Sequence, residues 1–81
     1  MRTIWLSSGD SVNIKSAGEA SVSTMIQYEY LLKDNRQIEA ALLLVESLLQ
    51  FKEDISLVKE MSAEEFGKFV QEWMEDSDEN L

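Results

Sequence analysis

The sequence predicts a small α+β domain that is mainly helical, with a short N-terminal β-hairpin packed on about three helices. Two short segments with strand-like alternation open the chain, and three longer segments then repeat apolar residues at helical spacing, without any proline. At 81 residues the core is close to the lower limit for independent stability. Because the chain contains no cysteine, disulfides cannot reinforce it, whereas self-association can.

The predicted hairpin spans residues 3–15. Residues 3–6 are β-branched and aromatic, residues 7–10 form a turn cluster, and residues 11–15 alternate polar and apolar side chains. A hairpin of this size is marginal alone, so it must lay one face on the helices. Its free edge could also pair with a second chain.

The first predicted helix spans residues 21–33, with Ser21 or Ser23 as its cap. It carries two apolar stripes, which predict contacts with two different surfaces. In one interpretation the hairpin covers one stripe and the next helix covers the other; in the alternative, one stripe binds a partner. The stripes consist of Val22, Ile26 and Tyr30, and of Met25, Tyr28 and Leu32.

The second predicted helix spans residues 37–51. Its apolar arc covers roughly 200° of the circumference, on the ideal turn of 100° per residue, whereas a surface helix needs little more than 100°. This helix must therefore be central to the domain, or part of its surface must be an interface. The arc contains Ile38, Ala40, Ala41, Leu42, Leu44, Val45, Leu48, Leu49 and Phe51.

A short turn is expected at 54–60, followed by a third helix at 63–75 and an acidic tail at 76–81 that frays. Ser62 and Glu65 form a capping box at the start of this helix. Its apolar stripe is mainly core, with the last two members expected at an interface. The stripe consists of Phe66, Phe69, Val70, Trp73 and Met74.

The net charge of −9 is concentrated in residues 53–81, which hold ten of the sixteen acidic residues and two of the seven basic ones. Such a surface disfavours nucleic acid and anionic membranes as partners, and favours a basic partner or simple solubility. No apolar run reaches the length of a membrane span, so an intracellular, soluble protein is expected.

Catalysis is not expected. The chain has neither histidine nor cysteine and no phosphate-binding or nucleophile motif. Its paired carboxylates, such as Glu64 and Glu65, lie on the polar face of a helix, where water keeps them ionised. We therefore expect no catalytic residue, cofactor, metal or small-molecule substrate. An enzyme that uses paired carboxylates is the least favoured alternative.

The chain resembles the small tail assembly chaperones of long-tailed bacteriophages and prophages. The likeness lies in the strand-like segment 11–15, the leucine-rich middle, and the segment 53–66 that leads to Phe69 and Trp73. The resemblance implies a non-catalytic protein that self-associates and coats the hydrophobic helices of a tape-measure protein during tail assembly. It also implies a cytoplasmic location in a bacterial host.

The predicted function is therefore protein–protein interaction, through self-association or a hydrophobic helical client. The alternative is an acidic inhibitor, such as a DNA mimic, that binds a basic protein surface. Nine residues are predicted to form the protein interface: Tyr28, Leu31, Leu32, Ala40, Leu44, Leu48, Phe51, Trp73 and Met74.

Overall fold

The chain begins with a β-hairpin in the computed structural model, which describes residues 1–79 and the side chains of residues 1–75. Strands β1 (Arg2–Trp5) and β2 (Ser11–Ile14) are antiparallel, with Ile4 opposite Val12. Val12 and Ile14 are two residues apart and therefore share a face of β2, which is the buried one. Gly9, with φ of +95°, allows the chain to reverse between the strands.

Within residues 1–79, four α-helices and two 3-10 turns follow the hairpin, which confirms the predicted fold class. Ser21 caps α1, since its hydroxyl accepts a hydrogen bond from the Thr24 amide. Ser62 similarly accepts from the Glu65 amide at the start of α4, at 3.1 Å. The elements are η1 (Ala17–Glu19), α1 (Val22–Lys33), α2 (Gln37–Leu48), η2 (Lys52–Asp54), α3 (Ile55–Lys59) and α4 (Ala63–Glu79).

The second helix ends three residues earlier than the predicted 37–51. Leu49 adopts an extended conformation and forms a bridge with Ile14, while the Gln50 amide donates to the Asn13 carbonyl at 2.9 Å. The segment after α2 thus pairs with the free side of β2. This pairing satisfies backbone groups that a longer helix would have to bond differently.

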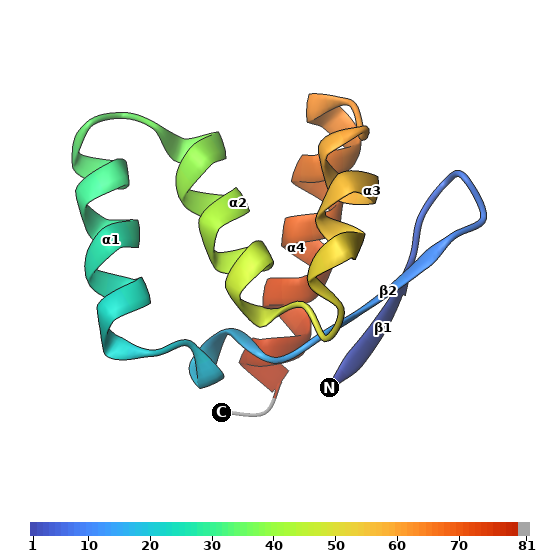
Figure 1. The fold of residues 1–81 in the computed structure, drawn as a ribbon, viewed down its shortest axis with the longest axis horizontal. Helices are drawn as coiled ribbons and strands as arrows, with labels where there is room; N and C mark the ends of the chain where they lie inside the picture. The colour runs from blue at the N-terminus through green and yellow to red at the C-terminus, as the bar shows by residue number, and fades with distance from the viewer. Residues whose placement is uncertain (80–81) are drawn as a thin grey trace.

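The helices follow one another across the molecule in chain order, and the N-terminal hairpin lies beyond α3 and α4 (Figure 1). Helix α1 forms one end, α2 lies beside it, α3 and α4 come next, and the hairpin forms the opposite end. The hairpin therefore does not cover an apolar stripe of α1, and the interpretation that placed it there is wrong. The reason is that the hairpin packs its apolar face on α4 and on the end of α2 and buries its apolar surface there.

The core lies between the hairpin, α2, α3 and α4. Trp73, on α4, is buried at its centre, and its indole Nε1 donates to the Lys15 carbonyl at 2.9 Å. Within the part of the chain whose side chains are described, the buried apolar residues are Ile4, Val12, Ile14, Ala40, Leu44, Val45, Leu48, Leu49, Val58, Phe66, Phe69 and Trp73.

Helix α4 is longer than the predicted 63–75, because it continues to Glu79. The backbone of 76–79 is thus helical, the fraying expected there stays a prediction, and residues 80–81 of the predicted tail lie outside the described residues. Once the Trp73 turn is fixed in the core, each further residue adds a backbone hydrogen bond at little extra cost. No helix among residues 1–79 is both long and apolar enough to cross a membrane.

Candidate protein-binding surface

Helix α1 contributes less to the core than the other long helices do. It packs on α2, and none of its twelve residues is buried. Met25 and Tyr28 reach the core from its inner face but remain partly exposed. The apolar side chains on the outer face of α1 are not buried by the fold of the chain. Exposed apolar surface of this kind marks a candidate site for a protein partner.

The outer face of α1 carries three large apolar side chains in one line. Val22 is 76% exposed, Ile26 49% and Tyr30 69%. Their i, i+4 and i+8 spacing places them on successive turns of the same side of the helix. We call these three residues the α1 ridge.

Two charged residues run beside the α1 ridge. Ile26, Glu29, Tyr30 and Lys33 line a shallow hollow on the surface of the helix. Their i, i+3, i+4 and i+7 spacing is that of the four-residue hole that receives a side chain from a packed helix. The outer face of α1 thus has both the projections and the hollow of a helix-packing surface.

A second apolar surface lies where α2 and α4 face each other near their N-terminal ends. Ile38 is 62% exposed at this place, although it belongs to the apolar arc of α2. The floor of the groove includes Gly67, and the position that a Cβ would take there has no atom within 4 Å. We call this surface the α2/α4 groove; its apolar lining consists of Ile38, Ala41, Ala63, Phe66, Gly67 and Val70.

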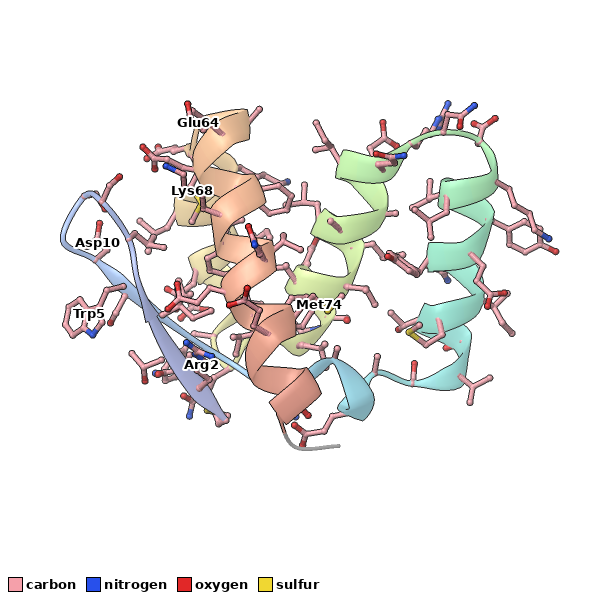
Figure 2. All side chains as sticks on the ribbon, turned by 180° about the vertical axis from the view of Figure 1, so that it is seen from behind. Arg2, Trp5, Asp10, Glu64, Lys68 and Met74 are labelled. Atoms are coloured by element: carbon pink, nitrogen blue, oxygen red, sulfur yellow. The ribbon has the colours of Figure 1, made fainter. Side chains whose placement is uncertain are left out.

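The acidic side chains of α4 that the structure describes, those up to residue 75, have partners within the chain. Glu72 forms a 3.0 Å ion pair with Arg2, and Glu65 accepts a 2.8 Å hydrogen bond from the Ser7 hydroxyl. Glu64 lies 3.6 Å from the ammonium of Lys68 (Figure 2). The contacts of Arg2 and Ser7 link the hairpin to α4, and the Arg2 and Lys68 cations offset part of the negative charge of the helix.

Four of the nine predicted interface residues are wrong, because the structure buries them in the core. Two further residues are exposed, and three are half-buried. A core side chain cannot contact a partner while this fold is intact, and burial here provides the apolar contacts that stabilise a small domain. The buried residues are Ala40, Leu44, Leu48 and Trp73; Leu32 and Phe51 are exposed; Tyr28, Leu31 and Met74 are half-buried.

The nine predicted residues do not come together on one surface, and the α1 ridge and Ile38 are absent from them. A signal for the ridge was nevertheless present, since two stripes on one short helix exceed what a single neighbouring helix can cover. The sequence contains no signal that Ile38 is exposed, because Ile38 has the same helical spacing as the core residues of α2.

The described residues offer no metal centre, since no group of three or more carboxylates in that part of the chain is placed to hold an ion. Comparison of the chain with protein-family models, curated proteins and solved structures gave no match. The candidate binding surface is therefore described by the exposure and spacing of its own residues.

Proposed function

We propose that this chain is a non-catalytic interaction protein that binds an apolar helical segment of a protein through the outer face of α1. The observation that carries the proposal is the α1 ridge, three large apolar side chains exposed on successive turns. A peripheral helix with such a face matches the helix-packing mode of peptide recognition, in which anchors repeat at i, i+3, i+4 and i+7.

The resemblance to tail assembly chaperones makes this proposal more specific. In that setting the client is a long hydrophobic helix, and the acidic surface of α4 keeps the complex in solution. The acidic residues would then act on solubility, while α1 provides the contact.

The test uses a designed amphipathic peptide of three leucine-containing heptads, without net charge, titrated into isotopically labelled protein. Amide chemical shifts should change along α1, centred on Ile26, and the binding should vary little with salt, because apolar contacts are not screened. The Ile26→Asp variant should bind at least about tenfold more weakly. Trp5→Asp is the matched control, since Trp5 is exposed on the hairpin and points away from the helices (Figure 2).

Absence of peptide-induced shifts on α1 would refute the proposal. Shifts confined to the acidic face of α4, seen with a basic peptide and lost at high salt, would favour an acidic inhibitor instead.

A further inference from the structure

Strand β1 is an edge of the sheet, and its outer side pairs with no other strand among residues 1–79. The opposite edge is covered, because Leu49 and Gln50 pair with β2 there. A sheet edge with unpaired backbone groups can accept a further strand from another chain. We infer that β1 binds an extended, basic segment of a partner protein, which adds to the sheet in the groove between β1 and α4. This surface is separate from the α1 ridge, so the inference goes beyond the proposed function.

The hydrogen-bond register identifies the backbone groups of β1 that are available. On the far side of β2 the Gln50 amide donates to the Asn13 carbonyl at 2.9 Å, so the backbone groups of Asn13 point away from β1. Thr3 is opposite Asn13 in this non-hydrogen-bonded pair, and its own N–H and C=O are therefore directed outward. Trp5, two residues further along, is oriented in the same way. Neither backbone has a hydrogen-bond partner in the described part of the chain, so both can pair with an added strand.

A hollow of about 190 Å³ lies beside this edge, where β1 runs along α4 (Figure 2). Residues 4–7 line it in succession, and none of its described lining residues belongs to β2, which places it on the unpaired side of β1. Lys68 and Glu72 also line it and already form ion pairs within the chain. Side chains of an added strand that lie opposite Ile4 and Leu6 point to the same face of the sheet as these two residues. The inward positions of the bound segment should therefore be apolar, to match the apolar part of the lining: Ile4, Leu6, Met61 and Phe69.

The charges at the hairpin turn favour a basic segment. A second hollow shares Leu6 and Met61 with the first, and its lining contains three carboxylates, those of Asp10, Glu60 and Glu65. Asp10 and Glu65 accept hydrogen bonds from serine hydroxyls, but none of the three forms an ion pair within the described residues. The described lining of this hollow includes neither lysine nor arginine. A cationic side chain near the end of the added strand would be attracted here, whereas an acidic segment would be repelled.

Amide hydrogen exchange, followed by NMR, tests the inference on the full chain. The probe is a short peptide in which valine alternates with threonine and each end carries a lysine. At saturation the amides of Thr3 and Trp5 should exchange at least about tenfold more slowly, because each becomes a hydrogen-bond donor to the peptide. The Ile4 amide is the internal control and should change little, because Ile4 is opposite Val12 in a hydrogen-bonded pair.

Two N-methylated peptides test the backbone pairing without altering the protein. One is methylated at its valines and the other at its threonines. Only alternate amides of a paired strand point toward the neighbouring strand. One methylated peptide should therefore bind at least about tenfold more weakly, and the other should bind like the unmodified peptide.

The charge preference is tested with a matched pair of variants at exposed carboxylates. Glu60→Gln should weaken binding about two- to fivefold, whereas Glu46→Gln, on α2, should leave it unchanged. Unchanged exchange of Thr3 and Trp5 at about 1 mM peptide, equal affinities of the two methylated peptides, or equal effects of the two variants would each overturn the inference. The neutral helical peptide reports separately on α1, so its binding there would leave the proposed function standing.

Discussion

The indole Nε1 of Trp73 donates a 2.9 Å hydrogen bond to the carbonyl of Lys15, joining residues 58 positions apart in the sequence. The bond connects α4 to the residue that directly follows β2. The same tryptophan is almost completely buried among apolar side chains. One residue therefore closes the core and fixes the hairpin to the C-terminal helix.

Replacing Trp73 by phenylalanine should destabilise the protein by about 1–3 kcal/mol, because the Lys15 carbonyl loses its donor and the core loses volume. Urea denaturation followed by circular dichroism measures the loss. The control is Trp5→Phe, at an exposed position, which should stay within about 0.5 kcal/mol of the wild type. Equal effects at the two sites would contradict the packing of Trp73.

The two tryptophans should also differ in fluorescence. Trp73 is buried and Trp5 is 72% exposed, so iodide should quench Trp5 strongly and Trp73 weakly. The single-tryptophan variants Trp5→Phe and Trp73→Phe separate the two signals. In the folded Trp5→Phe variant, emission from Trp73 should lie at shorter wavelength and move to longer wavelength on unfolding. Similar quenching of both residues in the native state would be inconsistent with the fold.

The Ser62 hydroxyl should contribute measurably to stability through its 3.1 Å contact with the Glu65 amide. Ser62→Ala should lower the free energy of unfolding by about 0.5–2 kcal/mol, whereas Ser62→Gly should cost only a few tenths of a kcal/mol. Thermal unfolding of both variants provides the measurement. The prediction fails if alanine is tolerated better than glycine.

Glycine at position 67 should be less favourable for folding than alanine. Gly67→Ala should stabilise the monomer by about 0.5–1 kcal/mol, because helix interiors favour alanine and a Cβ there meets no atom within 4 Å. Thermal unfolding of Gly67→Ala provides the measurement, and Ala63→Gly, which should lower the stability, is the complementary variant. A Gly67→Ala variant that is less stable than the wild type would contradict the open space beside Gly67.

The ion pair between Arg2 and Glu72 should contribute little. The two side chains are 29% and 53% exposed, so solvent screens their 3.0 Å contact. A double-mutant cycle with Arg2→Met and Glu72→Gln should give a coupling of about 0–1 kcal/mol that falls as salt is added. A coupling that is larger and independent of salt would show that the hairpin is held to α4 mainly by this pair.

The sequence predicted the elements better than the surfaces. Alternation around Val12 and the cap at Ser62 are local signals, and both lie where they were expected. The sequence did not predict the end of α2 at Leu48, because Leu49 continues the helical apolar pattern. In the structure, Leu49 pairs with Ile14 instead of extending the helix. Burial of Leu44 and exposure of Ile38 could not be distinguished, since both fit the same arc. The difference depends on where α4 approaches α2, which is a tertiary property.

The bridge between Ile14 and Leu49 has a consequence for how the molecule opens. It joins the two ends of a segment that contains η1, α1 and α2, so α1 lies within a loop whose base is already closed. Because α1 holds no buried residue, its amides should exchange with solvent before those of α2 and α4. Loop-closure entropy grows slowly with length, at about 0.6 kcal/mol for each doubling. Evolution could therefore lengthen, shorten or re-sequence this helical arm at small energetic cost, while the hairpin and the remaining helices keep their positions.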